Sequence, residues 1–316
     1  MISIIVVNYN GKKFLKNCLE SLYNVNYQNK EIIVIDNGSR DRSFSFLYEE
    51  FITSKKIIFA GYQFNQGLAI ASNYGASLAK GDYLFFLNND TIVDKNIFNE
   101  LLKSNTDVTG SKMYDYTGAK ELDSALSVDR FGYPCGRTGQ IFYPDGAIFI
   151  KKEMFERIGG FDEELFLYGE DRDLCWRVLL AGGTISYCPS AIFYHASRCV
   201  NNTNFSRRKI AERNIIRSML KNYTLKSLLF ILPQYLFWSI LELGLLLVVN
   251  PKAIYKSYLP AYWWNVVNFR NTWQEHRKVQ KIRKVSDRYI RSKMSKQIGK
   301  LFVLRTIGIP KFKCAV

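Results

Sequence analysis

The first hundred residues alternate short apolar runs with amphipathic segments. Continuous apolar or aromatic runs, rich in β-branched residues, occupy residues 2–7, 31–36, 56–60 and 82–87. Between them, apolar positions recur at helical spacing in residues 12–25, 42–51 and 68–80. Short continuous apolar runs predict parallel strands that are covered on both faces. Strands and helices in alternation predict a doubly wound α/β sheet.

Each of the four predicted strands ends in, or is soon followed by, small polar or turn-forming residues. These lie at residues 8–11, 36–39, 65–67 and 88–90. Turn formation alone would explain one such strand end, because Asn, Asp and Gly are favoured in turns. Four polar strand ends at one edge of a sheet predict a ligand site beyond the carboxyl ends of the strands.

The middle of the chain, residues 105–200, has a less regular pattern. It predicts a strand at 146–152, a short helix at 153–161, a helix over 171–183 and a strand at 184–189. Gly182 and Gly183 end the longer helix, and Pro189 halts the strand that follows. Residues 92–103 predict one further helix just before this section.

A polar and basic segment near residues 200–210 divides the chain into a domain over 1–205 and a helical region over 206–316. Within that region, residues 228–249 are apolar and long enough to cross a bilayer. Pro233 and Glu242 interrupt this run, so monotopic or re-entrant insertion is favoured over a full crossing.

Residues 273–302 predict a basic amphipathic helix of the kind that lies at a membrane interface. Its apolar face would consist of Val279, Ile282, Val285 and Tyr289, with Lys and Arg side chains around the opposite face. Together with the apolar run, this helix predicts that the region after residue 205 associates with a membrane.

Charge is distributed unevenly along the chain. The net charge is +16, yet residues 205–316 carry 23 Lys and Arg against four Asp and Glu, and residues 1–204 carry 21 against 24. Such asymmetry favours an anionic partner, either nucleic acid or the anionic cytoplasmic leaflet. The basic region also contains the apolar run, so the sequence favours a membrane as the partner. No nucleic-acid partner is expected.

Composition adds three expectations. Hydrophobic residues make up 47% of the chain, which is enough for a large core. The first thirty residues lack the features of a signal peptide, which predicts the cytoplasm as the compartment. The six cysteines lie far apart without a C-x-x-C pair, so neither a zinc cluster nor a disulfide framework is expected.

Five motifs in order carry a resemblance to a known family. They are VNYNG from residue 7, VIDNGSRD from 34, NQGLAIASNYGASLAKGDYLFFLNND from 65, GGFDEELFLYGEDRDLCWR from 159 and FYHASR from 193. Over residues 1 to about 200 the chain resembles family 2 glycosyltransferases, especially the branch that includes rhamnosyltransferases and galactofuranosyltransferases. The resemblance implies a GT-A (Rossmann-like) fold, with a mixed, mainly parallel sheet flanked by helices.

The resemblance also implies a divalent cation that stabilises the departing diphosphate of a nucleotide sugar. Asp90 is the expected ligand, and its carboxylate oxygens suit Mg²⁺ or Mn²⁺. The family pattern is Asp-x-Asp, so Asn88 is expected to bind the ribose or a metal-bound water instead. In related enzymes a histidine at the place of His195 completes the metal site. Two alternatives remain open. His195 is then a structural histidine, and residues 88–90 then only cap a helix.

By the same resemblance Asp171 is the catalytic base that removes the proton of the acceptor hydroxyl, and Glu170 supports it. Inverting transfer needs such a base on the face opposite the leaving group. Acidic residues are also favoured at a helix N-terminus by the helix dipole alone, which leaves a structural role open.

The remaining expected site residues bind the nucleotide sugar. Asp36 would contact the base or ribose, and the others would line the same pocket, border the diphosphate or allow the backbone to approach the sugar. These others are Val7, Asn8, Tyr9, Asn65, Gly67, Asn73, Asn89 and Gly146. For Tyr9, Asn65 and Asn73, ordinary turn and helix packing is the alternative.

Two other enzyme classes share the general architecture but lack support here. The turn after the first strand has neither the G-x-G-x-x-G of a dinucleotide site nor the basic Gly-rich loop of a nucleotide-sugar pyrophosphorylase. The sequence therefore predicts an inverting glycosyltransferase at the cytoplasmic face of the cell membrane. Its expected donor is a UDP- or dTDP-sugar, and its expected acceptor is a lipid-linked glycan. The alternative is a basic membrane- or nucleic-acid-binding protein with a non-catalytic GT-A-like domain.

Overall fold

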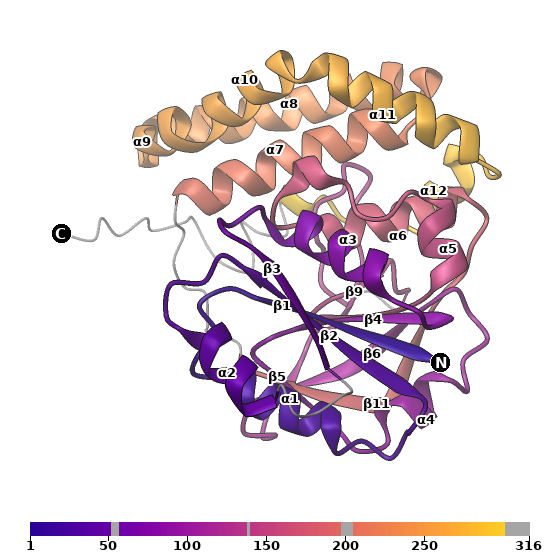
Figure 1. Ribbon diagram of the computed structural model, residues 1–316. Helices are drawn as coiled ribbons and strands as arrows, with labels where there is room; N and C mark the ends of the chain where they lie inside the picture. The colour runs from indigo at the N-terminus through magenta and orange to yellow at the C-terminus, as the bar shows by residue number, and fades with distance from the viewer. Residues whose placement is uncertain (52–56, 138–139, 197–204, 301–316) are drawn as a thin grey trace. The chain divides into compact units, whose positions relative to one another are not determined.

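The computed structural model of the 316-residue chain describes residues 1–51, 57–137, 140–196 and 205–300 (Figure 1). The chain forms two compact units. The first unit comprises residues 1–125, 143–178 and 183–198, and the second comprises 126–142, 179–182 and 199–316. The domain boundary predicted after residue 205 stays a prediction, and residues 197–204 beside it lie outside the described residues.

Nine strands form the main sheet of the first unit, in the order β3-β2-β1-β4-β10-β6-β11-β5 with β7 paired to β6. Their bounds are β1 Ile2–Asn8, β2 Lys30–Asn37, β3 Ile57–Tyr62, β4 Tyr83–Asn88, β5 Thr91–Val93, β6 Val108–Asp115, β7 Glu121–Leu122, β10 Ala147–Lys151 and β11 Ile185–His195. The strands β3, β2, β1 and β4 are mutually parallel, and β10 runs antiparallel to both of its neighbours. Strands β8 Ala125–Leu126 and β9 Tyr143–Pro144 form a separate two-stranded sheet. The predicted mixed, mainly parallel α/β sheet is confirmed.

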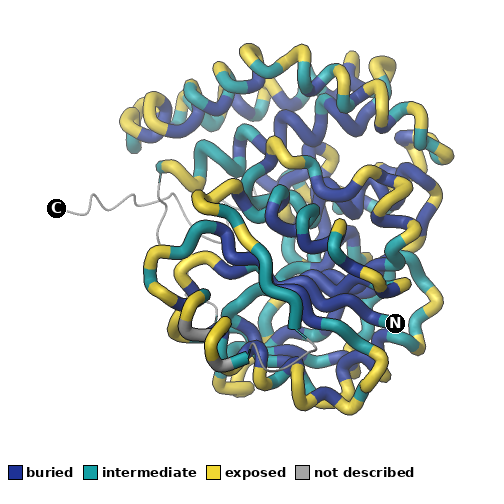
Figure 2. Tube along the Cα trace, in the orientation of Figure 1, coloured by how far each residue is buried: buried dark blue, intermediate teal, exposed yellow. Residues whose placement is uncertain are grey.

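Helices cover both faces of this sheet (Figure 1). Their bounds are α1 Leu15–Tyr23, α2 Ser43–Phe51, α3 Leu68–Leu78, α4 Ile97–Leu101, α5 Lys152–Arg157, the 3-10 helix η1 Glu163–Leu165 and α6 Glu170–Leu180. Alternate side chains of a strand point to opposite faces. Ile4 of β1 therefore packs in the core with α1 and α4, whereas Ile5 faces α3. A Cβ on Gly75 would lie 2.5 Å from Cγ2 of Ile5, so glycine is what lets α3 pack this closely. The strands at the centre of the sheet are buried along most of their length (Figure 2).

The first unit departs from the sequence-based expectations in one missed strand and two wrong predictions. Strand β6 was not predicted, because only three of its eight residues, VTGSKMYD, are apolar or aromatic, yet it lies inside the sheet between β10 and β11. Strand β11 does not halt at Pro189, since the register shifts between Cys188 and Ile192 and this bulge leaves the proline out of the ladder. The helix predicted at 92–103 is reduced to α4, because residues 91–93 pair with β11 as strand β5.

From residue 205 to residue 292 the second unit is mostly helical. Its helices are α7 Phe205–Asn222, α8 Leu225–Val249, α9 Pro251–Ala253, the π-helix η2 Ile254–Tyr258, α10 Leu259–Val267, α11 Phe269–Ile282 and α12 Asp287–Ser292. Pro233 and Glu242, which interrupt the apolar run in the sequence, both lie within the continuous helix α8. Its continuity is explained by packing, because Leu228, Ile231 and Tyr235 are buried along one face.

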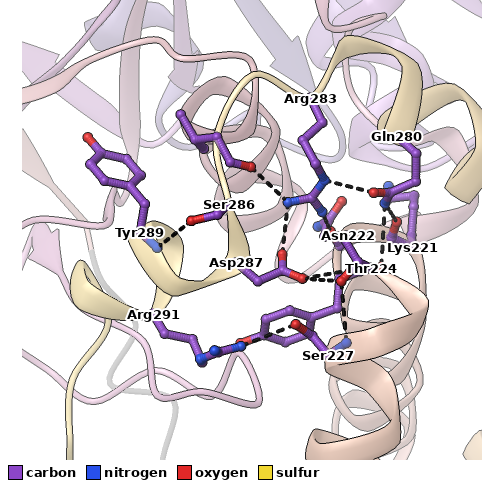
Figure 3. A network of polar contacts seen from close by, with 12 residues as sticks. Lys221, Asn222, Thr224, Ser227, Gln280, Arg283, Ser286, Asp287, Tyr289 and Arg291 are labelled. Atoms are coloured by element: carbon purple, nitrogen blue, oxygen red, sulfur yellow. Dashed lines mark hydrogen bonds and ion pairs between the residues drawn. The ribbon is translucent and has the colours of Figure 1, made fainter.

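The single basic helix predicted over 273–302 is also wrong, and residues 301 and 302 lie outside the described residues. Helix α11 ends at Ile282, and α12 begins at Asp287. A polar network fixes the turn between them (Figure 3). The Asp287 carboxylate accepts hydrogen bonds from Arg283 Nη1 at 2.8 Å and from Thr224 Oγ1 at 2.6 Å. Arg283 also donates to the backbone carbonyl of Asn222. These bonds tie the α11–α12 turn to the α7–α8 turn.

Candidate active site

A pocket of about 220 Å³ lies in the first unit at the carboxyl ends of β1 and β4. Its polar lining comes from α3, the end of β4, the turn before β10, the segment before α6 and the start of α6. It comprises Ser72, Asn88, Asp145, Tyr168, Glu170 and Asp171. Val7, Gly146 and apolar side chains such as Phe86 and Phe161 complete the walls. Of the predicted site residues, the pocket therefore brings together Val7, Asn88, Gly146, Glu170 and Asp171.

Three acidic side chains share this pocket. Burial, together with the nearby charge of Asp145, raises the pKa of Glu170 to about 7. Burial and the charges of Glu170 and Asp145 raise the pKa of Asp171 well above its usual range, although Arg172 opposes this shift. Oε2 of Glu170 is buried without a hydrogen-bond partner. A carboxyl group with a pKa near neutrality is suited to exchanging protons.

Asp90 and His195 form a pair beside the end of β4. The distance from Asp90 Oδ1 to His195 Nε2 is 3.2 Å, and Asn88 Nδ2 lies 3.2 Å from the same ring nitrogen. The antiparallel pairing of β5 with β11 brings these residues together, because it places His195 opposite Thr91. Asp90 and His195 are only partly exposed, at 27% and 17% of their side chains.

This pair fits part of a metal site. Ligands at about 2.1 Å from an octahedral ion lie roughly 3 Å apart, close to the separation of Asp90 Oδ1 and His195 Nε2. No group of three or more His, Cys, Asp or Glu side chains able to hold a metal occurs among the described residues. Mg²⁺ commonly takes one or two protein ligands, with waters and phosphate oxygens as the others. The donor set is therefore compatible with an ion that a bound diphosphate would help to hold.

The ends of β1 and β2 are joined by a network of polar side chains. Asn8 is fully buried, and its Nδ2 donates to Asp36 Oδ1 at 2.8 Å and to Ser43 Oγ at 2.9 Å. Its Oδ1 accepts from Asn89 Nδ2 at 2.9 Å. Asp36 also accepts from Ser39 Oγ at 2.6 Å. Three predicted nucleotide-binding residues, Asn8, Asp36 and Asn89, thus lie together and hold three strand ends in place.

Asn65 and Gly67 form a second polar turn before α3. Asn65 Oδ1 accepts from the backbone nitrogen of Gly67 at 2.9 Å and from Asn37 Nδ2 at 3.1 Å. Gly67 has a φ of +94°, and a Cβ there would lie 2.6 Å from the ring of Phe166. Only glycine fits this turn without strain.

Two other predicted residues lie outside the pocket lining. Both ends of the Asn73 amide bind the backbone of Phe161, at 2.9 Å to its nitrogen and 3.0 Å to its oxygen. Tyr9 is 47% exposed. The structure does not bring Tyr9 and Asn73 to the pocket, and their binding roles stay predictions.

By resemblance, Asp145 belongs with Gly146 to a segment that shapes the sugar pocket, but sequence reasoning assigned no specific role to Asp145, Asn37 or Arg172. Asp145 supplies a third carboxylate, Asn37 ties the β2 end to the turn before α3, and Arg172 is a buried cation near Asp171. Asp145 stands next to the predicted Gly146 and Asn37 next to Asp36, so proximity in sequence could have drawn attention to both. Arg172 likewise stands next to the predicted Asp171.

Solved structures of other proteins share this fold. The crystal structure of S. aureus TarS residues 1–349 in complex with UDP aligns with a TM-score of 0.51 at 18% identity, over 70% of this chain and 70% of that one. The structure of GalNAc-T7 with UDP, GalNAc and Mn²⁺ aligns with a TM-score of 0.58 at 18% identity, over 70% of this chain and 48% of that one. The fold is therefore that of GT-A glycosyltransferases.

Family comparisons assign the same part of the chain more narrowly. Residues 3–159 match the model of Glycosyl transferase family 2, and residues 128–198 match a model described as the N-terminal domain of galactosyltransferase. Glycosyltransferase GlyG of Streptococcus pneumoniae is 34% identical over 121 residues, which are 37% of this chain and 40% of GlyG. The chain thus spans well under two thirds of that relative. Residues 3–159 are a domain of glycosyltransferase family 2.

Proposed function

We propose that this protein is an inverting, metal-dependent glycosyltransferase that moves a sugar from a nucleoside diphosphate to an acceptor hydroxyl. The observation that supports this most is that one pocket is lined by Asn88, Glu170 and Asp171. The pair of Asp90 and His195 contacts Asn88 through the His195 ring. The family 2 domain supports the same reaction class.

The donor would occupy both the pocket and the strand ends beside it. At about 220 Å³ the pocket is smaller than the roughly 300–1,000 Å³ of sites for drug-sized ligands, so it suits a single sugar better than a whole nucleotide sugar. The nucleotide would then lie over the ends of β1 and β2, near Asn8 and Asp36. Uridine or thymidine diphosphate is the proposed carrier, and the UDP in the TarS and GalNAc-T7 structures supports uridine.

Asp90 and His195 would hold the divalent cation, Mg²⁺ or Mn²⁺. Bound there, the ion supplies a Lewis acid that stabilises the negative charge developing on the departing diphosphate. Asn88 would donate a hydrogen bond to the ribose or to a metal-bound water. Asp90 Oδ1 and Asn88 Nδ2 each lie 3.2 Å from His195 Nε2, which supports these roles.

Asp171 would act as the general base. As the acceptor hydroxyl attacks the anomeric carbon, its proton passes to the Asp171 carboxylate, a new C–O bond forms, and the bond to the diphosphate oxygen breaks with its electron pair. Burial, together with the neighbouring carboxylates of Glu170 and Asp145, raises the pKa of Asp171 and so favours proton uptake. Glu170 would support this base or contact the acceptor.

The acceptor side of the proposal concerns the second unit. We infer a lipid-linked glycan acceptor, a place at the cytoplasmic face of the cell membrane, and a donor of the rhamnosyl or galactofuranosyl kind, which the order of the five motifs supports. Among the described residues, α8 is long and apolar enough to cross a membrane by length and composition. Because Glu242 of α8 pairs with Arg208 and Lys300 inside the unit, we infer that α8 lies along the membrane surface.

One experiment tests the catalytic half. A panel of UDP- and dTDP-sugars is supplied with Mg²⁺ or Mn²⁺, and nucleoside diphosphate release is measured for the wild type and Asp171→Asn. We expect release with one or a few donors, its loss in EDTA, recovery on adding metal, and little release by the variant. Metal-independent release or full activity of Asp171→Asn would refute the mechanism.

The second candidate is a membrane- or nucleic-acid-binding protein with a non-catalytic GT-A-like domain. It is favoured by the basic charge of residues 205–316 and by the absence of Asp90 from the described pocket lining. The same assay separates the two functions. Vesicle or nucleic-acid binding without release from any donor would favour the non-catalytic protein.

A further inference from the structure

Two apolar hollows adjoin in the second unit between α7, α8, α10 and α11. One measures about 640 Å³ and the other about 620 Å³. They share three lining residues, Leu220, Leu232 and Phe269, and we call the joined hollow the apolar slot. The part toward the start of α8 also touches Leu229 and Trp273.

The apolar slot presents almost no free polar groups. Thr272 Oγ1 accepts from Arg217 at 2.9 Å and donates to the carbonyl of Asn268 at 3.1 Å. Ser239 Oγ accepts from Lys300 at 2.8 Å, and Asn265 Nδ2 donates to the carbonyl of Ala261 at 3.0 Å. Two other polar atoms of lining residues, Asn265 Oδ1 and the Tyr262 hydroxyl, have no hydrogen-bond partner, but both are buried. The slot therefore offers an occupant mainly hydrocarbon contacts. An occupant must therefore be apolar over most of its length.

One lining residue differs from the rest. Lys226, in the first turn of α8, is exposed and lines the slot at this end. Two further exposed cations, Arg270 and Arg277, lie on α11, the helix that supplies Phe269 and Trp273. A long-chain molecule with an anionic end matches this arrangement, because the acid could pair with Lys226 while the chain fills the slot.

Large apolar side chains are exposed along α8 and α10, both in the slot lining and outside it. On α8, Leu229 is 75% exposed and Val248 is 85% exposed; on α10, Trp263 is 67% exposed. Further large apolar side chains exposed by at least half are Phe230, Leu236, Phe237, Ile240, Leu247, Val266 and Val267. Exposed apolar surface of this kind marks an interaction site for a membrane or another protein.

Charge decides between these occupants. Residues 205–316 carry 23 basic against four acidic residues, so two copies of this unit would repel each other across a shared face. An anionic lipid surface attracts the same charges, each with a favourable contribution. The charge therefore favours lipid over a second copy of the chain.

We propose that the apolar slot binds one hydrocarbon chain of an anionic membrane lipid, with the acidic headgroup at Lys226. This site rests on the proposed membrane-associated function and adds to it a defined lipid site. The bound lipid would hold the second unit at the membrane more tightly than contacts of its exposed apolar surface alone.

The test uses the full chain and cis-parinaric acid, a fluorescent fatty acid, as the probe. We expect saturable binding of one probe molecule per chain. Leu232→Trp, which fills the shared centre of the slot, should weaken binding by at least about tenfold. The matched control is Leu247→Trp on the same helix, which is 60% exposed and outside the slot lining, and which should bind as the wild type does.

Two milder variants keep the test valid if Leu232→Trp fails to fold. Leu229→Gln changes a lining side chain that is 75% exposed, so it should weaken probe binding without unfolding the unit. Lys226→Gln should weaken binding of the fatty acid several-fold. Lys252 is an exposed cation outside the slot lining, so Lys252→Gln should leave binding unchanged. Wild-type affinity in both Leu229→Gln and Lys226→Gln would overturn the proposal.

Co-sedimentation with vesicles of equal parts phosphatidylglycerol and phosphatidylcholine separates the slot from the membrane association it rests on. Sedimentation without saturable probe binding would overturn the slot alone. Failure of the wild type to sediment would overturn the membrane association. The wild type could instead form a dimer that the Leu229→Gln variant does not form, and bind no probe. That result would assign this face to self-association and overturn the proposal that the slot binds lipid.

Discussion

The two units treat buried glutamates in opposite ways. In the first unit, Oε2 of Glu170 is buried without a partner, and the side chain shares a pocket with Asp171. In the second unit, Glu212 accepts hydrogen bonds from Tyr133 at 2.7 and 2.8 Å, and Lys300 Nζ lies 3.6 Å away. The first arrangement raises the pKa of Glu170 to about 7, and the second holds helices together.

The presence or absence of partners matches the roles proposed for the two glutamates. Glu170 is proposed to take part in the reaction, whereas Glu212 stabilises the second unit. A buried carboxylate without partners costs stability and is retained where its protonation matters. A buried carboxylate with partners stabilises the fold. Removing its partner leaves the carboxylate buried and uncompensated, which lowers stability strongly. The same contrast holds for apolar groups, which the first unit packs in its sheet and the second leaves exposed on α8 and α10.

The largest expected effect tests the catalytic side of this contrast. Asp171→Asn should lower nucleoside diphosphate release by about 10³- to 10⁴-fold, because the base can no longer accept the proton. The thermal midpoint should hold or rise, because one of three crowded carboxylates has gone. The matched variant is Asp173→Asn on the same helix. It breaks the buried 2.9 Å pair with Arg177 and should lower the midpoint instead.

The structural side of the contrast predicts the opposite response. Lys300→Met leaves Glu212 and Glu242 buried without their shared cation, and should lower the free energy of unfolding by about 3–5 kcal/mol in a denaturant titration. The exposed Lys296→Met should change it by less than about 0.5 kcal/mol. A loss as small as that of the control would mean that the Lys300 cluster is not a structural one.

The proposed metal ligand Asp90 and its neighbour Asn88 should differ in their effect on activity. Asp90→Ala should reduce metal-dependent release by about 100-fold or more, because it removes a charged ligand. Asn88→Ala should cost less than about tenfold, since it removes only a neutral hydrogen-bond donor. Release is measured over a series of Mn²⁺ concentrations. The reverse order would place the metal ligand at Asn88.

Asp287 offers a test by pH in the second unit. Burial alone would raise the pKa of its carboxyl, but hydrogen bonds from Thr224 and the charge of Arg283 outweigh burial and lower it. Its contribution to stability is therefore present above the unfolded pKa of about 3.9 and is lost as pH falls through the lower folded value. Asp287→Asn should cost about 1–3 kcal/mol at neutral pH, and the gap to the wild type should close in acid unfolding titrations. A gap independent of pH would contradict this.

The smallest expected effect is a shift in a pH profile. The charge of Asp145 helps to raise the pKa of both Glu170 and Asp171. Asp145→Asn should therefore move the acidic limb of kcat/KM to lower pH by up to about one unit, because the base stays deprotonated further into acid. A shift to higher pH would mean that Asp145 stabilises the deprotonated base.

Much of the first unit could be predicted because local patterns and tertiary packing agree there. Strands β1, β2 and β4 are continuous apolar runs, and they lie within one or two residues of the predicted bounds. Strand β6 could not be predicted from VTGSKMYD, since its place between β10 and β11, rather than its hydrophobicity, makes it a strand. The bulge that carries β11 past Pro189 likewise depends on its partner strand.

The sequence by itself determined the alternation of strands and helices, the polar strand ends and the position of Glu170 and Asp171 at a helix start, because each of these depends on residues close together along the chain. Only the tertiary structure decided that His195 lies beside Asp90, and that Glu242 of α8 pairs with Arg208 and Lys300. Both depend on contacts between residues distant in sequence. Periodicity describes one segment at a time and carries no information about which partner a side chain will meet.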